Sequence, residues 1–275
     1  MKIRPRRSVL FVPASNARML EKARGLACDV VVLDLEDAVA PELKEAARSN
    51  ACAAVASFGR REVVIRINAL SSAWGKYDLA AARSAKPDAI LLPKVAGAAD
   101  IAAARFEIPL WAMIETPMAV LNIAAIAAAG AACLMLGTND LLNDMQAQPL
   151  ADRRNLWPVL IGTVLAARAH GAAVIDGTHN ALDDAEGFAA ACVQGKAFGF
   201  DGKTLIHPGQ IEAANRIFAP SEEELGGARK ILAAFEEPQN RGKGAIALDG
   251  RMVEKLHADN AARLLALAAA IAERG

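Results

Sequence analysis

In the stretch Val30-Val31-Val32-Leu33-Asp34-Leu35-Glu36-Asp37, four consecutive apolar residues lead directly into a cluster of acids. A strand that is apolar throughout, rather than alternating, is typical of a parallel sheet covered by helices. The acids follow where such a strand would end, because an unpaired charge is costly inside a core. The stretch therefore predicts a buried parallel strand that carries charged side chains at its carboxyl end.

The same pattern recurs along the chain as far as Pro208. Short β-rich apolar runs alternate with longer alanine-rich stretches of helical spacing, such as Glu42–Ser57. The candidate strands are Ser8–Val12, Val30–Leu35, Glu62–Asn68, Ala89–Pro93, Leu110–Ile114, Cys133–Gly137, Ala173–Ile175 and Lys196–Phe200. Eight such units indicate an α/β protein with a (β/α)8 TIM barrel. The alternative, an open doubly wound sheet, would need a Gly-rich phosphate-binding turn after the first strand, where the chain has Pro13-Ala14-Ser15-Asn16.

The character of the sequence changes after Pro208. Helical stretches, a Gly-rich basic segment and a short strand follow, at Gly209–Phe218, Ser221–Phe235, Pro238–Gly244, Ala245–Leu248 and Lys255–Glu273. We predict a TIM-barrel catalytic domain over residues 1–218 and a C-terminal helical extension over residues 219–275. The extension is expected to form a mobile lid or to dock on a neighbouring subunit.

The composition excludes several classes of protein. The chain has 275 residues, with 31 basic and 31 acidic side chains, 54% apolar residues and 23% charged residues. These values do not fit a disordered or fibrous protein, and zero net charge gives no attraction to nucleic acid or an anionic membrane. The four cysteines form no CxxC pair, and the apolar run Val9–Val12 is too short for a secretory signal. We therefore expect a cytoplasmic protein with no nucleic-acid or membrane partner.

Nearly every candidate strand ends in ionisable or polar residues. In order along the chain these are Pro13 and Ser15; Asp34, Glu36 and Asp37; Arg66 and Asn68; Lys94; Glu115; Thr138, Asn139 and Asp140; Asp176; and Asp201 and Lys203. The carboxyl ends of the strands meet on one face of a TIM barrel, and catalysis takes place there. Packing alone does not explain so many charged ends, so they predict a carboxylate-rich site with several cationic side chains.

Glu115 and Asp140 follow successive candidate strands, so we expect them to converge on one point. Two carboxylates, completed by water and a chelating oxo-acid, suit octahedral Mg2+. The four histidines lack the spacing of zinc or iron sites. The alternative is that both acids are helix N-caps or ion-pair partners of Arg66 and Lys94, and the residues alone leave both interpretations open.

Arg66 stands near the end of the run Val63–Asn68. The planar guanidinium suits fork-like binding of a carboxylate or of a developing oxyanion. The alternative is a structural ion pair with Glu36 or Asp37, and we place these two acids beside Arg66 in the catalytic group as supporting residues. Lys94 lacks the apolar surroundings of a Schiff-base lysine, which argues against a class I aldolase.

Six ordered motifs resemble those of the citrate lyase beta-subunit-like proteins of the HpcH/HpaI aldolase superfamily, which includes malyl-CoA and citramalyl-CoA lyases. They are Arg7-Ser8-Val9-Leu10-Phe11-Val12-Pro13, Leu33-Asp34-Leu35-Glu36-Asp37-Ala38-Val39, Val64-Ile65-Arg66-Ile67-Asn68, Ile114-Glu115-Thr116-Pro117, Gly137-Thr138-Asn139-Asp140-Leu141 and Gly199-Phe200-Asp201-Gly202-Lys203-Thr204-Leu205-Ile206-His207-Pro208. The resemblance runs from about residue 4 to about residue 260, and it is specific to the family rather than to one substrate.

The resemblance implies a Mg2+-dependent TIM barrel, a homotrimer or hexamer, that cleaves or forms carbon–carbon bonds in 3-hydroxy acyl thioesters. By position, Glu115 and Asp140 resemble the metal ligands, and Arg66 resembles the group that binds the substrate's carboxylate and oxygen. The segments that hold Arg7, Ser8, Lys203 and His207 resemble those near the thioester carrier, which is CoA or an acyl carrier protein.

Two departures from the family pattern concern catalysis. The family's lyases carry an aspartate in the C-terminal lid, shortly after a Gly-x-Met-hydrophobic sequence, whereas Gly250-Arg251-Met252-Val253 is followed here by Glu254. Glutamate keeps the charge but moves the carboxylate by one methylene, and about 1 Å of misplacement can lower a rate about 100-fold. A family glutamate just before the metal aspartate is replaced by Asn139.

The sequence therefore predicts a lyase that acts by a retro-Claisen or retro-aldol reaction. A citryl-, malyl- or citramalyl-CoA-like thioester would yield an oxo-acid and an acyl thioester, with Glu254 as the acid that protonates the thioester enolate. Two alternatives stay open: a class II aldolase on a free hydroxy-keto acid, and a weakly catalytic subunit that binds a thioester and a metal.

Overall fold

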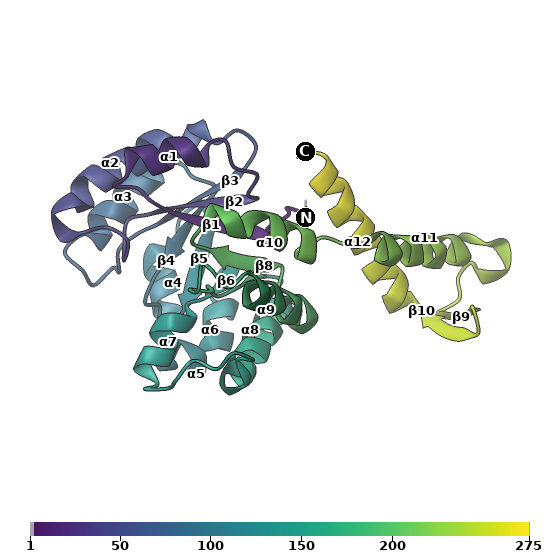
Figure 1. The fold of residues 1–275 in the computed structure, drawn as a ribbon. Coiled ribbons are helices and arrows are strands. Elements are labelled where there is room, and N and C mark those ends of the chain that lie inside the picture. Colours follow the sequence, from purple (N-terminus) through teal and green to yellow (C-terminus); the bar gives the residue numbers. More distant parts are fainter. Residues whose placement is uncertain (1–2, 275) are drawn as a thin grey trace. The chain divides into compact units, whose positions relative to one another are not determined.

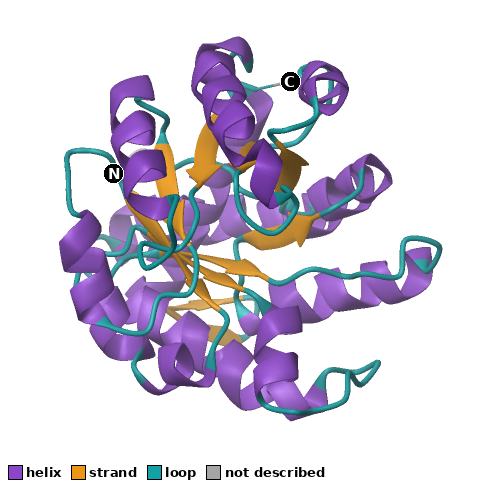
Figure 2. Cartoon of the chain, turned by 90° about the vertical axis from the view of Figure 1, so that its left-hand side faces the viewer, coloured by secondary structure: helices purple, strands orange, loops and turns teal. Residues whose placement is uncertain are grey.

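Parallel strands close into a barrel in this computed structural model, which describes residues 3–274. The barrel strands are β1 (Ser8–Pro13), β2 (Val30–Asp34), β3 (Glu62–Arg66), β4 (Ala89–Leu92), β5 (Leu110–Ile114), β6 (Cys133–Leu136), β7 (Ala173–Asp176) and β8 (Gly202–Leu205). Each strand pairs with the next along the chain, and β1 closes the ring against β8, with Val9 opposite Thr204. The strands lie at the centre of the unit with helices around them, so the predicted TIM barrel is confirmed (Figure 2).

Alternate residues of the strands fill the interior of the barrel. One cluster of buried side chains is made of strand residues alone: Val9, Val30, Val32, Val64, Ala89, Leu91, Trp111, Met113, Cys133, Met135 and Ile175. The residues between them, such as Val31 and Leu33, belong to a larger cluster that also contains helix residues. Because side chains alternate along a strand, these two clusters show which strand-end side chains face the barrel interior.

Helices that follow the strands along the chain form the outer layer of the barrel unit (Figure 1). They are α1 (Ala17–Ala23), α2 (Lys44–Ala54), α3 (Gly75–Ala85), α4 (Ala98–Ala104), α5 (Pro117–Leu121), α6 (Ile123–Ala128), α7 (Thr138–Asp144), α8 (Trp157–Ala169), α9 (Ala185–Phe198) and α10 (Ile211–Phe218), with short 3-10 helices at Pro41–Leu43, Val55–Ser57, Arg154–Leu156 and Pro208–Gln210. Alanine is frequent among their buried residues, for example Ala47, Ala51 and Ala54 of α2. Small side chains let the helices approach the barrel closely, which explains the alanine-rich composition.

The last barrel strand was predicted wrongly. The run Lys196–Phe200 does not form a strand: α9 continues to Phe198 and ends at Gly199, which adopts a left-handed conformation with φ 99°. The strand that closes the barrel is β8, whose sequence Gly202-Lys203-Thr204-Leu205 contains two polar residues. The strand was missed because it contains a lysine and is not apolar throughout. Lys203 can be buried there because Asp176 neutralises its charge, and the local sequence does not show that partner.

Residues 219–274, with residues 3–5, form a second compact unit, separate from the unit of residues 6–218. It contains α11 (Glu222–Glu236), a 3-10 helix at Pro238–Asn240, the antiparallel hairpin of β9 (Ala245–Leu248) and β10 (Arg251–Glu254), and α12 (Lys255–Ala272). The hairpin turns at Asp249 and Gly250, which both have positive φ. Asp-Gly is a strong two-residue hairpin signal, so β10 could have been predicted from the sequence. A small core of Ala234, Ile246 and Val253 holds the hairpin against α11.

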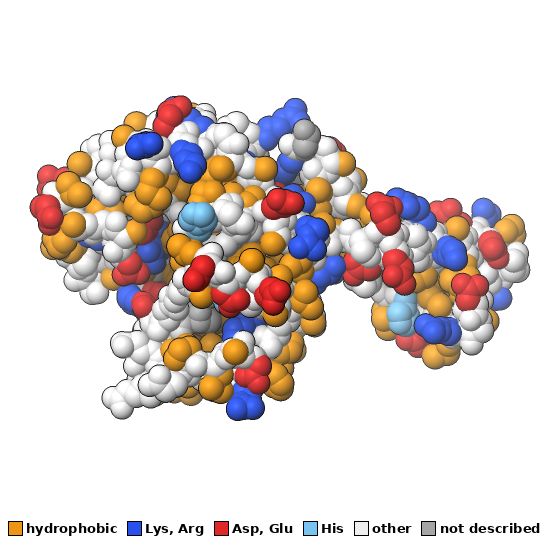
Figure 3. Space-filling model, viewed as in Figure 1, with side chains coloured by type: hydrophobic (Ala, Val, Ile, Leu, Met, Phe, Trp, Pro, Cys, Tyr) orange, Lys and Arg blue, Asp and Glu red, His pale blue; other side chains and the backbone are white. Residues whose placement is uncertain are grey.

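Charged side chains of both signs are interspersed on the face of the barrel unit that Figure 3 shows. This mixture agrees with the equal numbers of acidic and basic residues in the sequence. No helix among residues 3–274 combines the length and the hydrophobicity needed to cross a membrane.

Candidate metal and substrate site

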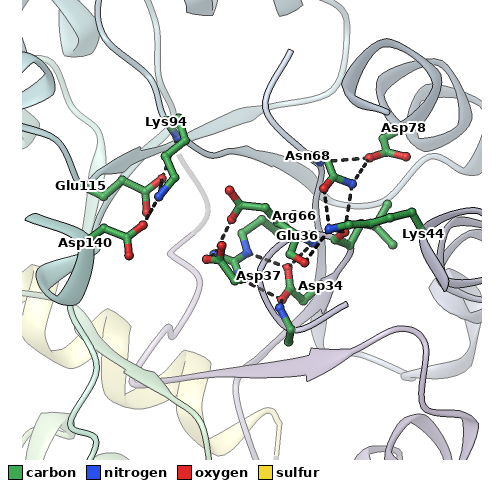
Figure 4. A network of polar contacts seen from close by, with 12 residues as sticks. Asp34, Glu36, Asp37, Lys44, Arg66, Asn68, Asp78, Lys94, Glu115 and Asp140 are labelled. Atoms are coloured by element: carbon green, nitrogen blue, oxygen red, sulfur yellow. Dashed lines mark hydrogen bonds and ion pairs between the residues drawn. The ribbon is translucent and has the colours of Figure 1, made fainter. Parts of the chain in front are cut away.

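Glu115 and Asp140 come together at the carboxyl end of the barrel, as the sequence predicted. Glu115 directly follows β5, and Asp140 lies in the first turn of α7, just after β6. Between their carboxylates lies the ammonium group of Lys94, which contacts Asp140 Oδ2 and is 3.6 Å from Glu115 Oε1 (Figure 4). Two acids thus flank a single positive charge, and a divalent cation in the place of the ammonium would balance both carboxylates.

Glu115 is held tightly in a buried position. It is 1% exposed, and Oε1 accepts a hydrogen bond of 2.7 Å from the backbone N–H of Lys94. Gly137 leaves the space for this side chain, since a Cβ there would lie 2.5 Å from Glu115 Cβ and 2.7 Å from Oε2. Burial raises the pKa of Glu115, while Lys94 and Arg66 oppose that shift. A nearby cation would favour the ionised carboxylate.

The carboxylate pair fits Mg2+ better than a softer metal. Within residues 3–274 no group of three or more His, Cys, Asp or Glu side chains could hold an ion. Mg2+ is commonly bound through one or two carboxylates and keeps several waters, and Asp140 is sufficiently exposed to leave room for them. Neither acid is a helix N-cap, because Thr116 and Gly137 occupy those positions. Of the alternatives from the sequence, only the ion pair with Lys94 is observed.

Arg66 lies at the end of β3 and is surrounded by acids. Nε and Nη2 donate to the two oxygens of Asp34 at 2.6 and 2.8 Å, and Nη1 is 2.8 Å from Glu36 and 3.0 Å from Asp37. The guanidinium also stacks over Phe11, 4.9 Å from the ring centre. Burial alone would lower the pKa of Arg66, but these acids raise it above its usual value. The predicted ion pairs with Glu36 and Asp37 are therefore present.

Glu36 is the acid of this cluster best suited to transfer a proton. Burial raises its pKa to about 8, because the loss of solvation outweighs the attraction of Arg66. Its Oε2 forms an ion pair with Arg66 but makes no well-oriented hydrogen bond in the part of the chain that the structure describes. A carboxyl group that titrates near neutral pH can take up and release a proton during a reaction.

The structure places Arg7, Ser8 and Lys203 away from these carboxylates. Ser8 begins β1 and Arg7 precedes it, so both lie at the amino end of the barrel, where Arg7 pairs with Asp29 at 2.8 Å. At about 3.3 Å per residue, the length of a strand separates them from the carboxylates. Lys203 is fully buried beside Asp176, at 2.8 Å. These three side chains are already engaged in the fold and are not carried into the proposed substrate site.

His207 and Asn139 do lie at the carboxyl end of the barrel. His207 is exposed two residues after β8, and its Nδ1 accepts a hydrogen bond from the backbone of Gly209 at 3.1 Å. Asn139 exchanges hydrogen bonds with Asn180 at 2.8 and 3.2 Å, which ties the turn before Asp140 to the loop after β7.

Glu254 belongs to the second unit, where it ends β10. Its backbone N–H donates to His257 Nδ1 at 3.0 Å, which fixes the start of α12. The role of Glu254 in catalysis stays a prediction.

Three residues in or beside the site were missed from the sequence. Gly137 gives no signal, because only the packed structure reveals the close approach of Glu115. Phe11 is one apolar residue of a strand among many. Lys44 did leave a signal: it shares the buried face of α2 with Ala47 and Ala51, and a lysine on an apolar helix face calls for a specific partner.

We expect Arg66→Lys to lower the free energy of unfolding by about 1–3 kcal/mol, because one ammonium cannot replace the paired hydrogen bonds to Asp34 or the stacking on Phe11. Urea denaturation measures the change. Arg18→Lys is the control, since Arg18 is exposed and should tolerate the exchange within about 0.5 kcal/mol. Equal stability of the two variants would show that the fork geometry at Arg66 is unimportant.

Acids and an arginine gathered at the carboxyl end of a closed parallel barrel define a TIM-barrel enzyme. The chain belongs to the HpcH/HpaI aldolase/citrate lyase family, whose model matches residues 7–208. The resemblance seen in the sequence motifs is thereby confirmed.

Similar proteins cover nearly the whole chain. The (3S)-malyl-CoA thioesterase of Cereibacter sphaeroides strain KD131 is 47% identical over 274 residues, which are 98% of this chain and 96% of that protein. Citrate lyase subunit beta of Leuconostoc mesenteroides subsp. cremoris is 35% identical over 283 residues, covering 96% and 94%. Among solved structures, CitE from Mycobacterium tuberculosis in complex with magnesium, acetoacetate and coenzyme A matches with a TM-score of 0.81 at 33% identity, covering 95% of this chain and 97% of that one.

Proposed function

We propose that the chain is a Mg2+-dependent enzyme that hydrolyses the thioester bond of malyl-CoA or a similar hydroxy-acyl-CoA. The observation that carries the proposal is the pair of carboxylates, Glu115 and Asp140, around one positive charge at the carboxyl end of the barrel. The choice of bond rests on the similarity to (3S)-malyl-CoA thioesterases, at 47% identity, against 35% for a citrate lyase beta subunit. Hydrolysis was not considered from the sequence alone.

Glu115 and Asp140 would hold the metal ion, with Gly137 and the backbone of Lys94 keeping Glu115 in place. When bound, Mg2+ would act as a Lewis acid toward the oxygens of the hydroxy acid and orient it. CitE of M. tuberculosis, with magnesium, acetoacetate and coenzyme A bound, supports both the metal and the class of substrate.

In this proposal Arg66 stabilises the negative charge that develops on the thioester carbonyl oxygen, since a guanidinium held rigidly by Asp34 needs no reorganisation. Glu36 accepts a proton from the attacking water. The water oxygen bonds to the carbonyl carbon, the carbon–sulfur bond breaks, and the CoA thiolate takes the proton from Glu36. The products are the free hydroxy acid and CoA.

The second candidate is the carbon–carbon lyase reaction predicted from the sequence. It is favoured by the citrate lyase beta subunits among the relatives and uses the same carboxylate pair. In this reaction Glu36, supported by Asp37, would remove the proton of the 3-hydroxyl group, and Glu254 would protonate the thioester enolate. His207 would lie near the thioester carrier, and a homotrimer or hexamer stays the expected assembly.

Incubation of the purified protein with (3S)-malyl-CoA and MgCl2 tests the proposal. We expect one free thiol and one malate for each thioester consumed, because hydrolysis breaks only the carbon–sulfur bond. EDTA should abolish the reaction and excess MgCl2 should restore it. Thiol release is followed with a thiol reagent and malate by an enzyme-coupled assay.

The product pattern separates the alternatives. Glyoxylate and acetyl-CoA without free thiol would establish the lyase. Oxo-acid release from a free hydroxy-keto acid alone would indicate a class II aldolase. The protein could also bind the metal but turn over none of the malyl-, citramalyl- or citryl thioesters, whether on CoA or on an acyl carrier protein. This result would indicate a weakly catalytic subunit that binds a thioester and a metal.

A further inference from the structure

Lys44 is a buried lysine with no part in the mechanism above. It begins α2, and the residue is 6% exposed. Its ammonium donates to the backbone carbonyls of Leu35 and Glu36 at 2.8 and 2.7 Å and to Asn68 Oδ1 at 2.7 Å. All three acceptors are neutral oxygens. A buried ammonium that is not paired with a carboxylate is costly, so these hydrogen bonds, together with the Trp74 ring 5.5 Å away, have to compensate for its burial.

The hydrogen bonds of Lys44 hold the loop that carries Glu36. On its other side the same loop is held by Asp34, whose carboxylate accepts hydrogen bonds from the backbone N–H groups of Glu36 and Ala38 at 2.9 and 3.2 Å. The loop is thus fixed from both sides: Asp34 holds the N–H groups of Glu36 and Ala38, and Lys44 holds the carbonyl groups of Leu35 and Glu36. This conformation places the Glu36 carboxylate against Arg66.

Lys44 is itself fixed by a second set of polar contacts. Asn68 donates to Leu35 O at 2.9 Å and to Asp78 Oδ2 at 2.6 Å, and Asp78 pairs with Arg48 of α2 at 2.6 Å. Figure 4 shows this group on one side of the acids around Arg66, with Glu115 and Asp140 on the other side. The network joins the ends of β2 and β3 to α2 and α3.

The charge of Lys44 also matches its surroundings. Burial lowers its pKa, and Asp34, Glu36, Asp78 and Asp37 act in the opposite direction. Among residues 3–274, Asp34, Glu36 and Asp37 make direct contacts with only one cation, Arg66. A second positive charge behind the loop reduces the repulsion among these acids.

We propose that Lys44 is a positioning residue, which holds the backbone of Leu35 and Glu36 so that the Glu36 carboxyl stays in place for proton transfer. This inference rests on the proposed function of the site. It predicts that Lys44 acts on the chemical step rather than on binding of the metal or of the thioester.

The test compares Lys44→Met with the wild-type protein and with Lys22→Met, a change of an exposed lysine in α1. Methionine keeps the length of the side chain but removes its charge and donors. With (3S)-malyl-CoA and Mg2+ we expect kcat to fall about 10- to 30-fold, with KM and the Kd for Mn2+ changed less than about threefold. Hydrogen exchange of the amides of residues 35–38 should become about tenfold faster, while the barrel strands stay protected.

An unchanged kcat in Lys44→Met, or faster exchange throughout the barrel, would overturn the proposal. Should this variant not fold, Lys44→Gln takes its place, because glutamine keeps a hydrogen-bond donor but loses the charge and is too short to reach all three acceptors; kcat is again expected to fall about tenfold. An unchanged kcat with that variant contradicts the proposal. If the wild-type protein turns over no thioester, the proposed function fails, and hydrogen exchange of residues 35–38 alone decides the role of Lys44.

Discussion

Replacing Glu115 by glutamine is expected to abolish tight Mg2+ binding and to lower kcat at least about 1,000-fold, because a metal ion supplies several kcal/mol of transition-state stabilisation. Glutamine has nearly the same shape, but its neutral amide provides no charge for the ion. The side chain is buried and burial raises the pKa of the acid, so the amide should not lower the stability of the fold. Titration calorimetry with Mg2+ or Mn2+, together with the malyl-CoA assay, measures both effects.

Glu107→Gln is the matched control, since Glu107 is exposed and the substitution is chemically the same. It should leave metal affinity, kcat and the unfolding midpoint unchanged. If Glu115→Gln still binds Mg2+ with wild-type affinity, the ion is held elsewhere. Loss of activity with undiminished metal binding would instead assign Glu115 to the substrate.

Much of the site could be predicted because a parallel barrel brings its strand ends together. Glu115, Asp140 and Arg66 follow three apolar runs of the sequence, and the topology alone carries them to one edge. The apolar runs themselves were sufficient to locate most of the strands. β8 was the exception, because its charged residue is neutralised by a partner 27 residues away.

Which charged strand ends reach the interior could not be predicted. Asp34 lies opposite Arg66 across β2 and β3, and Asp176 lies opposite Lys203 across β7 and β8. Asp34 alternates in phase with Val30 and Val32 of the interior cluster, whereas Asp176 is in phase with Val174, which packs toward the helices. A shift of one residue along a strand moves a side chain to the other face of the sheet. The pair of Asp34 and Arg66 therefore faces the barrel interior and the site, whereas the similar pair of Asp176 and Lys203 is a structural contact beneath the helices.

The buried pair beneath the helices has its own electrostatic balance. Burial alone would raise the pKa of Asp176, but Lys203 and Arg153 together hold it below its usual value. Arg153 contacts both oxygens of Asp176 at 2.8 Å. Charge neutralisation of this kind needs three segments far apart in the sequence, and no local pattern reveals it.

Gly137→Ala is expected to lower kcat at least about 100-fold and to weaken Mg2+ binding, since displacement of a reacting group by about 1 Å is enough for such a loss. The backbone at Gly137 has φ −106°, outside the left-handed region that favours glycine, so a positive φ is not the cause. The cause is the new methyl group, which would lie 2.5 Å from Glu115 Cβ and 3.0 Å from Met113 Cε. Both neighbours are buried, and Glu115 has to move away from the position that faces Asp140.

The control for this change is Gly162→Ala in the middle of α8, where a Cβ would meet nothing within 4 Å. Alanine is favoured over glycine in a helix, so this variant should keep its activity and gain up to about 1 kcal/mol in the free energy of unfolding. Calorimetry and the malyl-CoA assay on both variants distinguish a local effect from a general one. Gly137→Ala with wild-type metal affinity and kcat would mean that Glu115 can move without consequence, and the carboxylate pair would then not be the metal site. If Gly137→Ala loses metal binding but keeps its fold, the activity depends on the close approach of Gly137, after β6, to Glu115, after β5.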